Sequence, residues 1–384
     1  MITILNINLI AGRTGAAKLC KTISEWLPYT DFSYHTLVGY NFWNNNNTTS
    51  VYTTSKGRRY TIFRYKLSVW LNFLFDRLTP WHIDMKFLQE YTPYQQADIV
   101  HIHSIQWWYI DWTILLQISK EKKIIMTVHD DRLVSWNDDD KNLFSYKTSF
   151  SYQKRKEIFA NLSIIYVGVS HWMSNKIRSD TIVWDNKIRT IYNGINTSIF
   201  QYFNKIEARK TLWLPLNKKI IISIAWSGSK SNLKWLQYIK RIMTYYKNNK
   251  NYLFITIWNS VTKVISDSYH EIGLIDSEEI AKYYNSADCF LYPTLADSFG
   301  LVVAESIACW CPVVTFDVWW VPEIVEHKKS WYIATYKDLN DLVRWFEWVM
   351  ANKDTMNMTL DKKFHQETMI QQYANLYKSL MRSS

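Results

Sequence analysis

The chain has 384 residues, a formal net charge of +11 and no run of 18 apolar residues. This length suits two domains, and no membrane-spanning helix is expected. Its start, MITILNINLIAG, lacks a basic leader and a cleavage site and predicts a first β-strand rather than a signal peptide.

The charge suits attraction to anionic nucleotides, lipid carriers or a cytoplasmic membrane face. A codon bias toward lysine explains it equally well. Aromatic residues are abundant but accompany no nucleic-acid motif, so no nucleic-acid partner is expected. The cysteines form no paired C-x-x-C sets, which argues against zinc, and free thiols suit a reducing cytoplasm. They are Cys20, Cys289, Cys309 and Cys311.

Short β-branched runs alternate with longer helical patterns, which predicts an α/β fold with parallel sheets. The expected strands are Ile2–Asn8, Asp98–His103, Lys123–His129 and Ile164–Val169 in the first half, and Lys219–Ala225, Tyr252–Ile257, Cys289–Pro293 and Pro312–Phe316 in the second. TIYNGINTSIF, residues 190–200, lies between the two series, and Asn193 and Gly194 suit a linker turn. Two Rossmann-like halves would bind ligands at the carboxyl ends of their strands.

Three segments of the first half place candidate site residues after a strand. In IAGRTGAAK, residues 10–18, Gly12 and Gly15 permit a tight loop and a close backbone approach, although an ordinary turn is the alternative. His103 ends the ADIVHIH strand, and His129 ends the IIMTVH strand. A histidine at this place serves either a site or the structure, and the residues alone leave both open.

In the second half, the strand of residues 220–225 runs into a Gly/Ser loop and a basic helix start. Lys230 and Lys234 can act there as point charges on phosphate. A solvated lysine face is the alternative.

SADCFLYPTLADSFGLVVAESIACWCPVV, residues 286–314, predicts a strand that ends at Pro293, a loop, and a helix that starts near Phe299. Asp297 falls in the loop, and Glu305 falls about two turns into the helix. The loop amides and the helix N-terminus can bind phosphate, and a carboxylate on the helix can accept hydrogen bonds from ribose hydroxyls. The alternatives are an N-cap at Asp297 or Ser298 and a surface charge at Glu305.

These motifs together resemble those of group 1 (family four) retaining glycosyltransferases. Asp297 and Glu305 are similar to the E-x7-E motif of that family. CWCPVVTFDVWWVPE, residues 309–323, is similar to its donor loop when Trp310, Trp319 and Trp320 are read as glycine. The segments VGVSHWMSNKI, with Trp172, and QQYANLYKSL, residues 371–380, also match the family.

The resemblance implies a GT-B fold, in which two Rossmann-like domains face a cleft. The expected acceptor domain is 1–190, with the C-terminal helix 366–384 packing back on it. The expected nucleotide-sugar domain is 191–365.

The resemblance also implies residue roles. The first acid, Asp297, would contact the donor sugar and the second, Glu305, the nucleotide ribose; the shorter Asp leaves the identity of the sugar open. Lys234, followed by Trp235 read as glycine, matches a Lys-Gly pair on the pyrophosphate, and Lys230 is the candidate second cation. His129 would lie beside the donor sugar, with Asp130 nearby. Ser298, Phe299 and Gly300 would contact the donor. Gly12, Gly15 and His103 would face the acceptor and the phosphate.

The implied reaction transfers a hexosyl group from a nucleotide-diphosphate sugar to a hydroxyl of a glycan or lipid-linked acceptor, with retention, in cell-surface polysaccharide assembly. No metal or other cofactor is expected, because Lys230, Lys234 and the helix N-terminus would stabilise the leaving pyrophosphate. The expected location is the cytoplasm, with peripheral association at the inner face of the membrane. The alternatives are a tryptophan-rich, non-catalytic carbohydrate-binding protein, an inactive homologue of the same fold, and a sugar-nucleotide epimerase.

The tryptophan content departs from an ordinary composition, with 20 Trp against 9 Gly. The two together reach about the share of glycine alone in an average protein, about 7%. Some genetic codes read UGA as glycine and others as tryptophan. We hypothesise that glycine codons have been translated here as tryptophan, which concerns Trp107, Trp108, Trp213, Trp235, Trp258, Trp310, Trp319, Trp320 and Trp331. A bulky residue forced to positive φ costs about 1–2 kcal/mol, so many such sites would exceed a typical stability of about 5–15 kcal/mol.

Overall fold

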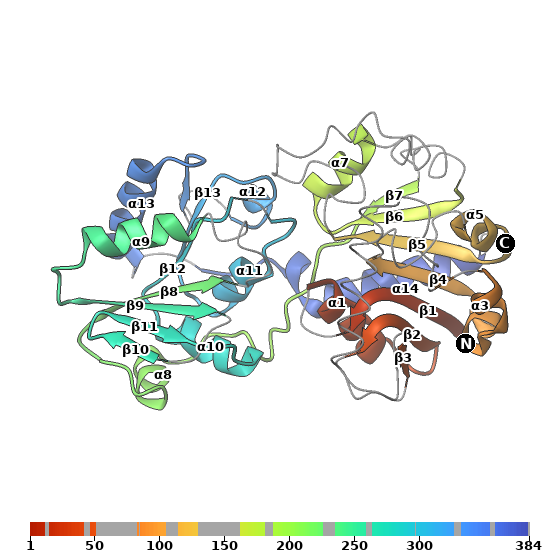
Figure 1. The fold of residues 1–384 in the computed structure, drawn as a ribbon, viewed down its shortest axis with the longest axis horizontal. Coiled ribbons are helices and arrows are strands. Elements are labelled where there is room, and N and C mark those ends of the chain that lie inside the picture. Colours follow the sequence, from red (N-terminus) through yellow and green to blue (C-terminus); the bar gives the residue numbers. More distant parts are fainter. Residues whose placement is uncertain are drawn as a thin grey trace, which may run out of the picture. The chain divides into compact units, whose positions relative to one another are not determined.

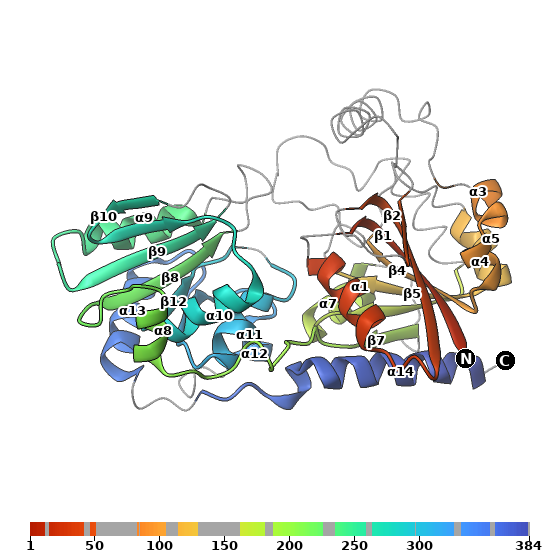
Figure 2. The ribbon, with the colours of Figure 1, turned by 90° about the horizontal axis from the view of Figure 1, so that it is seen from below.

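The computed structural model describes residues 1–11, 15–41, 47–50, 83, 85–104, 114–129, 162–180, 187–225, 235–258, 263–295, 297–325, 332–353 and 358–382. The chain divides into two compact units. Unit 1 comprises Met1–Tyr192 and Ile370–Ser384, and unit 2 comprises Asn193–Met369. Figure 1 shows each unit as a sheet flanked by helices, and Figure 2 shows the same elements from below.

Unit 1 is built on a seven-stranded sheet in the order β3-β2-β1-β4-β5-β6-β7, and every pairing is parallel. Its strands are β1 (Ile2–Ala11), β2 (Phe32–Asn41), β3 (Thr48–Ser50), β4 (Ile99–Ser104), β5 (Lys123–Val128), β6 (Ile164–Gly168) and β7 (Ile188–Thr190). Its helices are α1 (Gly15–Trp26), α3 (Met85–Glu90), α4 (Thr92–Gln96), α5 (Ile114–Glu121) and α7 (His171–Asp180). The strand order reverses between β1 and β4, so ligands are expected at the carboxyl ends of these strands.

Unit 2 repeats this plan with the order β10-β11-β9-β8-β12-β13-β14. Its strands are β8 (Lys219–Ala225), β9 (Tyr252–Trp258), β10 (Lys263–Ser266), β11 (Tyr269–Ile272), β12 (Cys289–Tyr292), β13 (Val313–Phe316) and β14 (Tyr332–Ala334). Only the β10–β11 pairing is antiparallel among those described. The helices are α8 (Lys205–Thr211), α9 (Leu236–Tyr245), α10 (Ser277–Ser286), α11 (Leu301–Ala308), α12 (Val321–Ile324) and α13 (Leu339–Asn352), followed by a 3-10 turn (Lys362–Phe364). Here the order reverses between β8 and β12.

The central strands are buried on both faces, which explains their continuous apolar runs. In β5 the five residues after Lys123 are all buried, and in β8 Ile220, Ile221 and Ile222 are fully buried. Helix starts follow local capping rules. Asp276, for example, accepts a hydrogen bond from the Glu279 amide (2.8 Å) at the start of α10.

Helix α14 (Gln366–Arg382) runs from unit 2 into unit 1. Its Tyr373 and Tyr377 are fully buried in unit 1, where Tyr377 packs edge-on against Phe32. Lys378 on the same helix forms an ion pair with Asp31 (2.6 Å). The last part of the chain therefore completes the core of the first unit.

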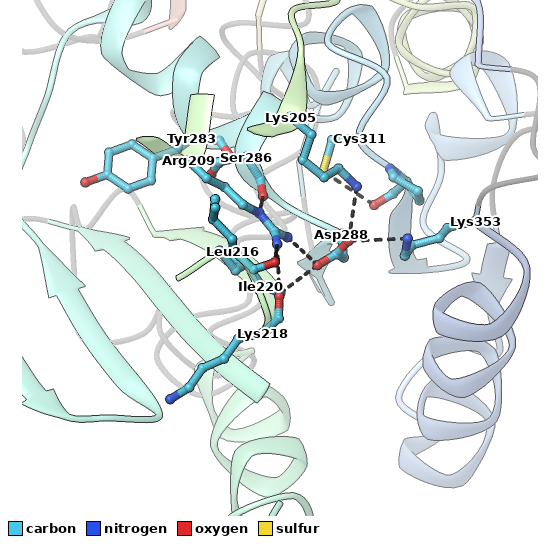
Figure 3. A network of polar contacts seen from close by, with 11 residues as sticks. Lys205, Arg209, Leu216, Lys218, Ile220, Tyr283, Ser286, Asp288, Cys311 and Lys353 are labelled. Atoms are coloured by element: carbon cyan, nitrogen blue, oxygen red, sulfur yellow. Dashed lines mark hydrogen bonds and ion pairs between the residues drawn. The ribbon is translucent and has the colours of Figure 1, made fainter. Parts of the chain in front are cut away.

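A buried carboxylate ties four elements of unit 2 together (Figure 3). Asp288, just before β12, pairs with Lys205 (3.0 Å) and Arg209 (2.7 Å) of α8 and with Lys353 (3.4 Å) at the end of α13, and it accepts a hydrogen bond from the β8 amide of Ile220 (2.8 Å). Burial raises the pKa of Asp288, but Lys205, the Ile220 amide and Arg209 outweigh that effect and lower the pKa below its usual value. The carboxylate is therefore charged at neutral pH and holds these elements in register.

The predicted α/β fold is confirmed, with sheets that are parallel except for the β10–β11 pairing, and all eight predicted strands are present. The prediction omitted six of the strands in the described residues, namely β2, β3, β7, β10, β11 and β14. None of the helices among the described residues is long and apolar enough to span a membrane.

Candidate functional site

In unit 1, the ends of β4 and β5 bring three histidines together. His101 and His103 point to the same side of β4 because they are two residues apart, and their ring centroids lie 3.9 Å apart. Nδ1 of His103 lies 3.4 Å from Nε2 of His129, which directly follows β5. His103 is buried and His129 is half-buried, so His129 is the more accessible of the predicted pair.

His101 anchors this cluster to the interior. Its Nδ1 lies 2.7 Å from the Tyr377 hydroxyl, its Nε2 lies 2.8 Å from Oγ1 of Thr127, and Thr127 in turn contacts the Tyr373 hydroxyl (3.0 Å). Burial, and then the charge on His129, lower the pKa of His101 to about 3. Burial and the two neighbouring histidines also lower the pKa of His103 well below its usual value. Both inner rings are therefore neutral at physiological pH.

The glycine loop of unit 1 is described only in part. Gly15 is the first residue of α1, is exposed, and follows β1, which pairs with β4. The predicted site residues Gly12, Lys230 and Lys234, together with Asp130, lie outside the described residues.

In unit 2, the segment between β12 and α11 holds four of the predicted residues, Asp297, Ser298, Phe299 and Gly300. The Asp297 carboxylate accepts hydrogen bonds from the Tyr292 hydroxyl (3.0 Å) and from the amides of Phe299 (3.2 Å) and Gly300 (3.1 Å). Gly300 caps α11 in a left-handed conformation, with φ 65° and ψ 56°. The helix thus begins at Leu301, slightly later than the predicted start near Phe299.

Glu305 is the fifth residue of α11 and is 8% exposed. It therefore lies just over one turn into the helix, and the predicted depth of two turns is wrong because the left-handed residue at 300 delays the helix start. A nearly buried carboxylate is unlike the surface charge that was the alternative. Among the described residues, no group of three or more histidine, cysteine or acidic side chains is arranged so that it could hold a metal ion.

The indole of Trp320 fills the space beside this turn. A Cβ atom added to Gly300 would lie 1.8 Å from Cη2 of Trp320, so the indole packs directly on the Gly300 backbone. Trp320 is fully buried and lies against Phe299 with the ring centroids 6.4 Å apart, and its indole N–H has no hydrogen-bond acceptor among the residues that the structure describes. A buried donor without an acceptor costs about 1–3 kcal/mol.

Three further tryptophans adopt a backbone conformation that favours glycine. Trp213, Trp310 and Trp319 have φ values of 55°, 58° and 37°. Trp235 and Trp320 have negative φ, so backbone conformation alone does not distinguish those two positions. Trp172, matched above to a family tryptophan, is half-buried in α7.

Tyr292, Tyr373 and Thr127 were not singled out from the sequence. Each contacts its partner across the fold or across a turn, so no motif spacing in the sequence predicts the contact. The H-x-H pattern at residues 101–103 did carry a signal, since two residues on one side of a strand necessarily share an environment.

Comparison with known proteins bears on both units. Residues 263–366 match the family model "Glycosyl transferases group 1", and residues 41–199 match "Glycosyltransferase Family 4". An uncharacterized 41.2 kDa protein in the cps region of Klebsiella pneumoniae is 22% identical over 74% of this chain and 80% of its own length. The N-acetyl-alpha-D-glucosaminyl L-malate synthase of Bacillus anthracis is 22% identical over 75% of this chain and 76% of its own.

Solved structures share the fold over the whole chain. Sucrose-phosphate synthase from Thermosynechococcus elongatus has a TM-score of 0.75 at 17% identity and full coverage of both chains. Anabaena HepE in complex with UDP and glucose has a TM-score of 0.65 at 14% identity over 99% of this chain and 100% of its own. WaaG, a glycosyltransferase involved in lipopolysaccharide biosynthesis, has a TM-score of 0.64 at 11% identity over 97% of this chain and 95% of its own.

These findings define the class. The architecture is the two-domain, Rossmann-like α/β fold of the GT-B glycosyltransferases. The family matches, with relatives in glycan biosynthesis, support a group 1 glycosyltransferase, and the protein is a transferase enzyme.

Proposed function

We propose that the protein is a retaining glycosyltransferase that moves a hexosyl group from a nucleotide-diphosphate sugar to a hydroxyl acceptor in cell-surface polysaccharide or glycan assembly. The observation that carries this proposal is the placement of Glu305. Its carboxylate is nearly buried on α11, directly after the loop that leaves β12, and β12 borders the strand-order reversal of unit 2. This is where doubly wound sheets bind nucleotides.

The comparisons support a nucleotide-sugar donor. HepE, with the same fold, was solved with UDP and glucose, and residues 263–366, which include Glu305, match the group 1 model. The polysaccharide context is supported by WaaG, which is involved in lipopolysaccharide biosynthesis. A glycan or lipid-linked acceptor at the inner membrane face is compatible with the net charge of +11.

In this proposal each unit supplies part of the chemistry. Glu305 accepts hydrogen bonds from the ribose hydroxyls, and the amides at the start of α11 face the phosphates with Ser298 and Gly300. Lys230 and Lys234 neutralise the pyrophosphate, so the reaction needs no metal. His129 of unit 1 serves the sugar, while His103 and the Gly12–Gly15 loop serve the acceptor side.

The transfer step proceeds on one face of the sugar. The acceptor oxygen forms a bond to the anomeric carbon as the bond from that carbon to the phosphate oxygen breaks. A donor phosphate oxygen takes the acceptor's proton, so no covalent glycosyl-enzyme forms. Mass spectrometry of the enzyme during turnover tests this step, because a trapped adduct would contradict it.

The variant Glu305→Gln tests the donor assignment. It keeps the side-chain shape but removes the charge, and hydrogen bonds to a charged group contribute about 1.5–3 kcal/mol, so nucleotide affinity should fall by at least about tenfold. Calorimetric titration with UDP, GDP and ADP measures this affinity. Glu278→Gln, at an exposed position of α10 in the same unit, is the matched control. Equal affinities in all three proteins would refute the donor site.

We also propose that several tryptophans of this sequence are glycines in the native protein. Four non-glycine residues among those described have left-handed φ, and three of them are tryptophans that the family resemblance reads as glycine. Trp320 supports the same proposal in another way, because its indole packs on the Gly300 backbone of the donor turn and its N–H finds no acceptor in the described part of the chain. A glycine at 320 would leave Gly300 accessible to a ligand.

Peptide masses from the native host test this proposal directly, and tryptophan at 310 in those peptides would overturn it.

A stability measurement tests the argument that tryptophan at positive φ destabilises the chain. Trp213→Gly should stabilise the chain by about 1 kcal/mol in urea unfolding, because Trp213 is 94% exposed and sits at φ 55°. Trp348→Gly, in the interior of α13, should instead destabilise the chain by about 0.5–1 kcal/mol.

A further inference from the structure

Asp297 is held from three directions by the protein itself. Its Oδ2 accepts the Tyr292 hydroxyl at 3.0 Å, and its Oδ1 accepts the amides of Phe299 and Gly300 at 3.2 and 3.1 Å. A carboxylate has about four lone-pair sites. Three of these sites are occupied by the two turn amides and by Tyr292, so most of the accepting capacity of Asp297 is directed at the protein itself rather than outward.

The turn that Asp297 closes determines where α11 begins. Gly300 caps the helix in the left-handed region and has no side chain with which to cap it. Asp297 supplies the acceptor for the Gly300 amide from three residues earlier. Glu305 follows just over one turn later on the same helix. A change in the turn would consequently displace Glu305.

Tyr292 approaches Asp297 from the sheet. It is the last residue of β12, and its ring stacks on Phe290 at 5.4 Å and meets Trp235 edge-on at 5.6 Å. Burial and the neighbouring carboxylate of Asp297 raise the pKa of Tyr292 well above its usual value. The phenol therefore stays protonated and donates a hydrogen bond to Asp297 from a fixed position on the strand.

We propose that Tyr292 is a positioning residue of the donor site: its hydroxyl orients Asp297, and Asp297 closes the 297–300 turn and thereby places Glu305. This inference rests on the proposed function. It gives Asp297 a role different from the direct sugar contact expected from the sequence. The charge of Asp297 matters less than its shape, because the turn needs an acceptor at Oδ1 and not an anion.

The comparison of Asp297→Asn with Asp297→Ala separates the two roles. Asparagine keeps an oxygen for the amides of Phe299 and Gly300, and its NH2 group can donate to the tyrosine oxygen. The affinity for the nucleotide sugar should therefore fall by less than about threefold in Asp297→Asn and by more than about tenfold in Asp297→Ala. Equal, large losses in both variants would show that the donor needs the negative charge and would overturn the proposal.

Tyr292→Phe removes only the hydroxyl and should weaken donor binding by about fivefold to tenfold. Tyr284→Phe is the matched control. The Tyr284 hydroxyl donates a hydrogen bond to the carbonyl of Val302 (3.0 Å) on α11, the helix that carries Glu305, and not to Asp297. The control should lower the stability without lowering the affinity. If Tyr292→Phe lowers the stability alone, Tyr292 is merely structural and the proposal fails.

A double-mutant cycle shows whether Tyr292 acts through Asp297. Adding Tyr292→Phe to Asp297→Ala should cause no further loss of affinity, whereas additive losses would overturn the proposal. Each protein is the full chain, and its residue 320 is the one, glycine or tryptophan, that the peptide masses from the native host give. Each is titrated with UDP-glucose, GDP-mannose and ADP-glucose. If the unsubstituted chain binds none of these nucleotide sugars, the proposed function itself fails and the positioning role fails with it. If the unsubstituted chain binds one of them and Tyr292→Phe binds it equally well, only this inference fails.

Discussion

His101 shows how a single buried side chain links the candidate site to the pH dependence of folding. Its pKa is about 3 in the folded protein, through burial and then His129, against about 6.5 in an unfolded chain. The unfolded state therefore binds more protons between these two values. Stability should decrease as the pH falls from about 6.5 toward 3.

The variant His101→Gln should flatten this dependence. Removing one such group should lower the slope by up to about 1.4 kcal/mol per pH unit between pH 6 and 4, measured by urea unfolding at several pH values. Tyr373→Phe is the control, because it removes the hydrogen bond to Thr127 (3.0 Å) without removing a group that titrates in this range. If both variants keep the slope of the unsubstituted protein, His101 does not cause the pH dependence of the unfolding free energy.

The sequence was informative about the residues of the site wherever chemistry follows the end of a strand. His103 lies near the end of β4, His129 directly follows β5, and Asp297 and Glu305 follow β12 in its loop and helix, which are the places that the strand and helix pattern of the sequence predicts. What it could not provide was the partner of each group. Tyr377 approaches His101 from 276 residues away, and such a contact depends on tertiary packing rather than on a local pattern.

At the scale of elements, the predicted strands share one physical signal, which is a β-branched run buried on both faces. The omitted strands lack it. Strands β7 and β14 have only three residues each, and β2 mixes polar with apolar residues in FSYHTLVGYN. The β10–β11 pair lies at the edge of its sheet, where Val264 is 70% exposed. Edge strands do not need a hydrophobic pattern on both faces.

The Asp288 cluster gives the element-scale prediction. Asp288→Asn leaves Lys205, Arg209 and Lys353 without their shared anion, and breaking a buried ion pair costs about 3–5 kcal/mol. The loss of unfolding free energy in urea measures this effect. Asp267→Asn, at an exposed turn of the same unit, should change the stability by less than about 0.5 kcal/mol.

The same variant should differ in its acid response. Because the folded pKa of Asp288 is lowered, its stabilisation is present above the unfolded value of about 4 and is lost as the pH falls below it. The gap in stability between Asp288→Asn and the unsubstituted protein should therefore shrink at pH 3. A constant gap from pH 7 to 3 would contradict the role of the charge.

At the scale of the whole molecule, two compact units predict two unfolding transitions in calorimetry. A nucleotide that binds unit 2 stabilises it by about 2.7 kcal/mol at a concentration of 100 times its Kd. UDP, GDP or ADP should therefore raise the midpoint temperature of one transition. Asp288→Asn, which destabilises unit 2, should lower the midpoint of that same transition and so identify it as the unfolding of unit 2. A nucleotide that raises only the other transition would place the donor in unit 1.

The path of α14 also bears on how the chain is made. Tyr373 and Tyr377 fill the interior of unit 1 together with residues of the first 130 positions. During synthesis the N-terminal sheet leaves the ribosome first, but its core stays open until residue 377 has emerged. Unit 2, whose residues 193–369 are contiguous, can close earlier. The first half to be synthesised is thus the second to be completed, and a chaperone that holds the nascent chain would have most to protect in that interval.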